Sequence, residues 1–197
     1  MTRLLRKLRA DRQGATIVEF AIVVPVMLLM LMGFAELAYE AYARSVLAGA
    51  MQKAGRDTTI RGSSVKTATI DAIVLDQVRT VAPAATFATP PSRKSYEKFG
   101  YVSPEPFTDK NGDGIRQPGE CFDDINGNGQ WDRDPGADGV GGDSDAVVYS
   151  VTVTYPRIFP VLNMLGWPAN AMATETTVLK NQPYKSQSTS TPKAVCT

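Results

Sequence analysis

The longest apolar stretch of the chain lies close to its beginning. From Ala15 to Ala35 the only charged residue is Glu19, and a run of this length predicts an α-helix that crosses a membrane. The alanine-rich stretch that follows contains no proline as far as Arg56, so we expect the same helix to continue to about Ala54, with Pro25 bending its membrane half.

Two further patterns predict a folded head. Apolar residues recur at threes and fours from Ile70 to Val81, which predicts an amphipathic helix that Ser64 can cap. Residues 147–155 then alternate between Val or Tyr and smaller or polar side chains, the pattern of a half-buried strand, and 171–179 is its expected partner. The expected fold class is α+β, with a long membrane-spanning helix, a second helix, an antiparallel sheet and a calcium-loop insertion.

The apolar segment 158–167 lies between these two strands and is bounded by Pro156 and Pro168. Its large side chains either cap the core or contact the membrane surface or a neighbouring subunit.

The same patterns divide the chain. We expect a basic leader at 1–14, a transmembrane helix at 15–35, a helix extension at 36–62, an extracytoplasmic head at 63–180 with an acidic loop at 107–145, and a polar tail at 181–197.

Charge sets the expected orientation. The leader carries five basic residues and one acidic residue, and such a cluster before a membrane helix stays in the cytoplasm and sends the rest of the chain outward. The whole chain has a net charge of +1 and no basic stripe with interleaved aromatic residues, so nucleic-acid binding is not expected.

Glu19 needs a partner, because an ionised side chain in hydrocarbon costs roughly 2.5 to 3.5 kcal/mol on insertion scales. A basic leader, Gly14 before Ala15, and Glu19 as the fifth residue after that junction resemble a type IV prepilin. The alanine-rich extension, the α+β head and Phe20 after Glu19 narrow the resemblance to the TadE-like minor pilins or pseudopilins of tight-adherence (Tad) pilus systems.

The resemblance implies cleavage by a prepilin peptidase between Gly14 and Ala15, contact of Glu19 with the new amino terminus of a neighbouring subunit, and a role for Phe20 in assembly. The implied partners are other pilin subunits, the inner-membrane assembly platform and membrane lipid. The alternative is a signal anchor whose Glu19 reaches water at the cytoplasmic interface. A secretory signal peptide fits less well, because the apolar run is long and lacks a small-residue cleavage site.

The acidic segment contains a twelve-residue calcium-loop pattern, D-x-[DN]-x-[DN]-G-x5-E. Alternate oxygen ligands, a glycine for the turn, a backbone carbonyl and a closing glutamate are what a hard cation requires. The residues of the first loop that would bind the ion are Asp109, Asn111, Asp113, Ile115 and Glu120.

A second, partial copy of the pattern begins four residues later. Its expected ligands are Asp124, Asn126, Asn128, Gln130 and Asp132. Its twelfth position is Pro135, so an acidic residue from elsewhere, such as Asp134, Asp138, Asp143 or Asp145, would have to complete it. The prolines around the first loop argue against the flanking helices of an EF-hand. The alternative is a surface turn rich in Gly, Asn and Asp.

Two cysteines, Cys121 and Cys196, allow one intramolecular disulfide outside the cytoplasm. The alternative is two free or intermolecularly paired thiols. The chain has no histidine and no nucleotide-binding or nucleophile motif, so we do not expect an enzyme.

The expected function is that of a minor pilin in a Tad-type, type IVb-like pilus, acting in assembly, initiation or surface adherence with calcium as the stabilising ion. The alternatives are a membrane-anchored calcium-binding adhesion module and a type II secretion pseudopilin.

Overall fold

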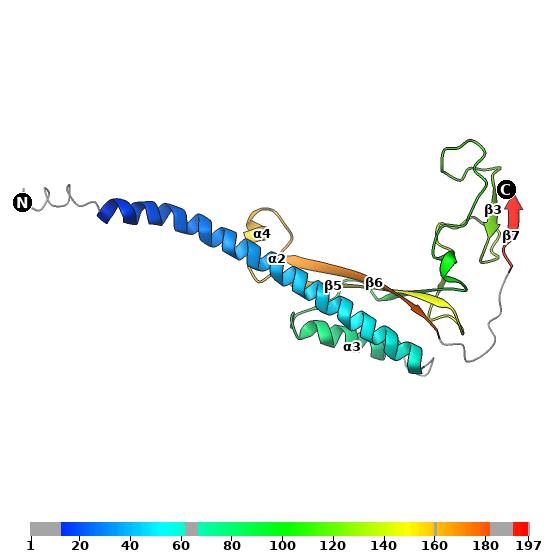
Figure 1. The fold of residues 1–197 in the computed structure, drawn as a ribbon, viewed down its shortest axis with the longest axis horizontal. Coiled ribbons are helices and arrows are strands. Elements are labelled where there is room, and N and C mark those ends of the chain that lie inside the picture. Colours follow the sequence, from blue (N-terminus) through cyan, green and yellow to red (C-terminus); the bar gives the residue numbers. More distant parts are fainter. Residues whose placement is uncertain (1–12, 62–66, 160, 182–190, 197) are drawn as a thin grey trace, which may run out of the picture. The chain divides into compact units, whose positions relative to one another are not determined.

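The apolar run and the alanine-rich extension form one helix, α2 (Gln13–Arg61), in a computed structural model that describes residues 13–61, 67–159, 161–181 and 191–196. The expected continuous helix is confirmed and extends past Ala54, with Pro25 inside it (Figure 1). Within the described residues, this helix alone is long and apolar enough to cross a membrane, and its most apolar stretch is not buried. Residues 1–12 of the expected leader and Ser64 lie outside the described residues.

The chain divides into two units. The first combines the residues up to Tyr42 with the segment Pro156–Ala171, and the second combines Ala43–Tyr155 with Met172–Thr197. The helix α2 and the two longest strands contribute residues to both units.

In the second unit, the core is built from the later turns of α2, a second helix and a sheet. The helix α3 (Thr67–Arg79) buries Ile70, Val74 and Val78 at the predicted spacing, although Ile73 is largely exposed. Figure 1 shows α3 alongside the C-terminal part of α2. Gly55 of α2 admits close packing, because an added Cβ there would lie 2.3 Å from Leu179 Cδ2.

The sheet is organised around β5 (Ala146–Pro156). From Val147 to Tyr155 every second side chain, each a Val or Tyr, is buried, and the side chains between them are half-exposed, as a period of two requires. This strand pairs antiparallel with β1 (Thr86–Phe87) and β2 (Ser92–Tyr96), and it also pairs with β6 (Asn170–Lys180). A short strand, β4 (Ala137–Asp138), pairs with β2. The two strands predicted from the sequence are therefore confirmed as sheet neighbours.

A polar cluster joins α3 to the sheet. Arg93 of β2 forms an ion pair with Asp71 of α3, and the Tyr149 hydroxyl donates to Asp71 Oδ1 at 2.6 Å. The Arg93 guanidinium also lies 4.1 Å from the centre of the Tyr149 ring. Burial, followed by the carboxylate of Asp71, raises the pKa of Tyr149, which keeps it a hydrogen-bond donor.

A second small sheet consists of β3 (Cys121–Asp124) and β7 (Lys193–Cys196), paired antiparallel. A 3-10 turn, η2 (Phe99–Tyr101), leads from β2 toward the acidic segment.

In the first unit, a loop containing the short helix α4 (Val161–Met164) contacts α2. The side chains of Phe159 and Leu162 are half-buried, but Leu165 is 72% exposed and Trp167 is 50% exposed. The interpretation of this segment as a cap on the core is therefore wrong for Leu165 and Trp167, because Gly166, with φ +87°, turns the chain at the end of α4 and leaves both side chains outside.

Candidate functional site

The first acidic loop is ordered by hydrogen bonds from its own backbone. Asp109 Oδ1 accepts the N–H of Gly112 at 2.6 Å, and Oδ2 accepts the N–H of Gly114 at 2.8 Å. The N–H of Gly114, which has φ +74°, is the largest cause of the lowered pKa of Asp109. A left-handed backbone at this position explains why the pattern requires glycine there.

The closing residue of this loop, Glu120, is only 4% exposed. Its Oε1 accepts the N–H of Lys110, at position two of the loop, and its Oε2 accepts the N–H of Gln117, at position nine, both at 2.9 Å. The first loop is therefore closed by a buried carboxylate that holds two of its backbone amides.

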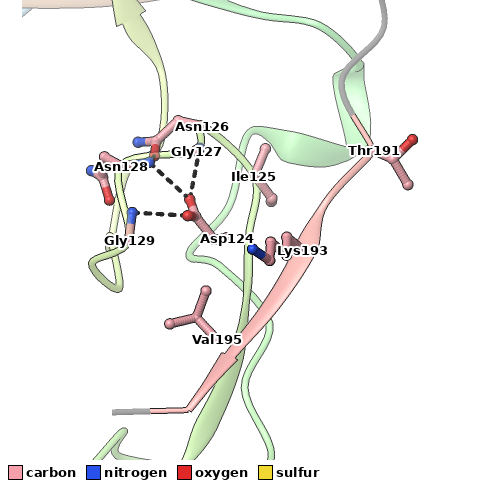
Figure 2. Close-up of a pocket in the computed structure, with 9 residues that line it drawn as sticks. All are labelled: Asp124, Ile125, Asn126, Gly127, Asn128, Gly129, Thr191, Lys193 and Val195. Atoms are coloured by element: carbon pink, nitrogen blue, oxygen red, sulfur yellow. Dashed lines mark hydrogen bonds between the residues drawn. The ribbon is translucent and has the colours of Figure 1, made fainter.

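The second loop repeats the bonds of the first. Asp124 Oδ1 accepts the N–H of Gly127 at 2.7 Å, and Oδ2 accepts the N–H of Gly129 at 2.8 Å (Figure 2). In both loops the side-chain oxygens at positions three and five accept the backbone N–H two residues further on. In the second loop Asn126 accepts from Asn128, and Asn128 accepts from Gln130. In the first loop Asn111 accepts from Asp113, and Asp113 accepts from Ile115. The similarity of the two loops in sequence is thus a similarity in structure.

Glu105 occupies in the second loop the place that Glu120 occupies in the first. It is 1% exposed, and its Oε1 accepts the N–H of Ile125, at position two, at 2.8 Å. Its Oε2 accepts the N–H of Asp132, at position nine, at 2.9 Å. A carboxylate from outside the second loop therefore makes the contacts that the twelfth residue, Glu120, makes in the first loop and that Pro135 cannot make in the second.

The sequence did not point to Glu105, because it precedes both loops and no spacing rule connects it to Asp124. Two of the candidates named from the sequence, Asp134 and Asp145, have other contacts. Asp134 accepts from Lys94 and Tyr96, and Asp145 accepts the N–H of Gly142. Burial would raise the pKa of Asp134, but these bonds and the Gly136 N–H lower it overall.

The side-chain atoms of both loops that could bind a cation are oxygens. A carboxylate oxygen that accepts one N–H keeps a second lone pair, so the bonds within the loops leave acceptor capacity for a hard cation. Among the described residues, no group of three or more His, Cys, Asp or Glu side chains is arranged to hold a metal ion. A cation in either loop would therefore have to draw on amide and backbone oxygens as well.

The strand β3 links the two loops, since it begins directly after Glu120 and ends at Asp124. Cys121 is paired in register with Cys196 of β7, and the two form a disulfide with a Cα–Cα distance of 4.1 Å. Figure 2 shows the pocket beside the second loop, which is lined by residues 124–129 and by Thr191, Lys193 and Val195. Among the described residues that line this pocket from the β7 side, Lys193 carries a charge.

The residues expected to act in processing and assembly lie at the start of α2. Gly14 is in the first turn, and nothing lies within 4 Å of a Cβ added there. Glu19 and Phe20 follow, both exposed along the apolar half of the helix. Residues 14–56 match the family model for TadE-like protein.

The TadE-like match confirms the resemblance predicted from the sequence, over the apolar part of α2 and most of its extension. It begins at Gly14 and includes Glu19. Neither the curated proteins nor the solved structures contain a match to the chain.

Proposed function

We propose that the chain is a minor pilin or pseudopilin that takes part in the assembly or initiation of a Tad-type pilus. The observation that carries the proposal is the TadE-like match beginning at Gly14, on a helix of sufficient length and apolar character to cross a membrane. The role is structural rather than catalytic, and its partners are other pilus components.

Processing follows from the same residues. A prepilin peptidase cleaves after Gly14, and the ammonium group of Ala15 then lies one helical turn from Glu19. In the fibre, Glu19 contacts the corresponding amine of a neighbouring subunit, which offsets the cost of an ionised carboxylate in hydrocarbon. The basic leader keeps that end of the chain cytoplasmic, and the head faces outward.

The test is the N-terminus of the membrane-extracted protein, determined by intact mass and peptide sequencing. We expect a chain that begins at Ala15. The Glu19→Gln variant keeps the shape of the side chain and removes its charge. We expect this variant to be cleaved at the same position but to be absent from pili sheared off the cells. A chain that retains residues 1–14 in cells with an active prepilin peptidase would refute the proposal and leave a membrane-anchored module.

We also propose that calcium binds both acidic loops and stabilises the head, with Glu120 and Glu105 as the closing carboxylates. The matching hydrogen bonds of the two loops support this, together with the oxygen-only donor set. A long polar segment rich in glycine buries little apolar area, so an ion would supply order that packing does not. The ammonium of Lys193 beside the second loop would weaken cation binding there.

Calorimetric titration of the full chain in detergent with calcium tests this second proposal. We expect two binding events, of which Glu120→Gln weakens one and Glu105→Gln weakens the other. Lys193→Gln should tighten the event that Glu105→Gln weakens. Asp123→Asn is the matched control, because Asp123 is an exposed carboxylate on the strand between the loops. Calcium binding that is unchanged in both glutamate variants would refute the assignment.

A further inference from the structure

The loop between β5 and β6 is fixed to α2 by a buried charged cluster. Glu36 is 0% exposed, and its Oε2 accepts the backbone N–H groups of Ile158 and Phe159 at 3.1 and 3.0 Å. The guanidinium of Arg157 lies 3.6 Å from Glu36 Oε1 and also contacts Glu40. All these residues belong to the first unit, so the contacts fix the loop at one level along the helix.

That level coincides with the end of the apolar run. Glu36 directly follows Ala35, the last residue of the run that starts at Ala15. At about 1.5 Å per residue, the run is about 30 Å long, the thickness of the hydrocarbon layer. If α2 crosses a membrane, Glu36 marks the boundary where the helix leaves the hydrocarbon, and the loop lies beside that boundary (Figure 1).

The loop presents large apolar side chains to its surroundings. Residues 158–167 carry no charge, and the exposed apolar side chains among them are Ile158, Met164, Leu165 and Trp167. An exposed apolar patch of this kind marks an interaction surface. The loop is also braced from within, because Arg157 lies 5.6 Å from the Trp167 ring centre and its Nε donates to the Pro168 carbonyl at 2.9 Å.

We propose that the exposed apolar side chains of this loop, those of Ile158, Met164, Leu165 and Trp167, insert into the outer interfacial layer of the bilayer that α2 crosses. The inference rests on the anchoring part of the proposed function. Lipid is the partner because the loop continues the apolar surface of α2 at the boundary where Trp side chains are enriched in membrane proteins. The buried pairing of Glu36 with Arg157 offsets the charge of each of these two side chains, which lowers the cost of placing them at this position.

The test uses the full chain in lipid vesicles that contain brominated phospholipids, with bromine either near the headgroup or deep in the acyl chain. The chain has two tryptophans, so Trp131→Phe leaves Trp167 as the reporter, and Trp167→Phe leaves Trp131, in the head, as the matched control. We expect the shallow bromine to quench Trp167 severalfold more strongly than Trp131, and more strongly than the deep bromine does.

The outcomes separate this inference from the anchoring on which it rests. If the chain floats with the vesicles and Trp167 is not quenched, the anchoring stands and the loop inference is overturned. If the environment of Trp167 changes only as the protein density in the vesicles rises, the loop contacts a neighbouring subunit and the lipid assignment is wrong. A chain that does not float overturns both. If Trp131→Phe does not fold, the difference between wild type and Trp167→Phe still isolates Trp167.

Discussion

Replacing Glu105 by glutamine removes a carboxylate that accepts hydrogen bonds from two backbone N–H groups. Glu105 is almost fully buried and accepts the N–H groups of Ile125 and Asp132 at 2.8 and 2.9 Å. Glutamine has nearly the same shape but a single acceptor oxygen, so its amide nitrogen would face one of the two N–H donors. We expect the second acidic loop to loosen even in the absence of calcium.

The magnitude follows from the two bonds. A hydrogen bond to a charged group contributes about 1.5 to 3 kcal/mol, and a neutral one about 0.5 to 1.5 kcal/mol. Losing one charged bond and weakening the other lowers the free energy of unfolding by about 2 to 4 kcal/mol. For a unit of this size the melting temperature would fall by about 5 to 15 °C.

Trp131 offers a local readout, because its indole N–H donates to the Glu105 carbonyl at 2.8 Å and its ring packs edge-on against Phe107. The assay is a thermal melt of the full chain in detergent micelles with chelator present, followed by tryptophan fluorescence in a Trp167→Phe background. Asp123→Asn is the control, as an exposed carboxylate on β3. If Glu105→Gln melts at the same temperature as this control, the two N–H bonds do not stabilise the loop and the reasoning is refuted.

Three further predictions concern the second unit. Hydrogen bonds from the backbone lower the pKa of Asp109 in the folded protein. The ionised carboxylate therefore stabilises the loop fully above the pKa of an unfolded aspartate, and this contribution is lost as the pH falls through the lowered folded pKa. Hydrogen-exchange protection of the Gly114 amide should accordingly persist into mild acid and then be lost. Reducing the disulfide should lower stability by about 2 to 4 kcal/mol, and identical melts with and without reductant would contradict this. Asp71→Asn breaks the pairing with Arg93 and should cost about 2 to 4 kcal/mol, whereas Asp76→Asn, on the exposed face of the same helix, should change stability by less than about 0.5 kcal/mol in parallel denaturation curves.

The helix and the two long strands could be predicted because their signals are local. An apolar run, a density of alanines and a period of two each determine the structure of their own segment without reference to the rest of the chain. The spacing that identified the first acidic loop is local in the same way, and the second loop could be recognised by comparison with the first.

The features that were missed depend on distant partners. The strand β2 has the polar sequence Ser-Arg-Lys-Ser-Tyr, and it forms because β5 offers it a register and Asp71 pairs with Arg93. Glu105 closes the second acidic loop, although the whole first acidic loop lies between Glu105 and Asp124 in the sequence. The exposure of Trp167 depends on the turn at Gly166, in a loop whose backbone is held to α2 by the buried carboxylate of Glu36. None of these relations leaves a periodic signal in the sequence.

The disulfide between β3 and β7 turns a large part of the head into a covalent ring, because 75 positions separate Cys121 from Cys196. Fully extended, a segment of that length would reach about 250 Å. Because the disulfide joins its two ends, a force applied to the chain on either side of the ring cannot extend this segment. A protease that cuts one exposed loop within the ring opens it without releasing a fragment. A single cut in the second acidic loop would thus leave both sides of the break joined through the disulfide.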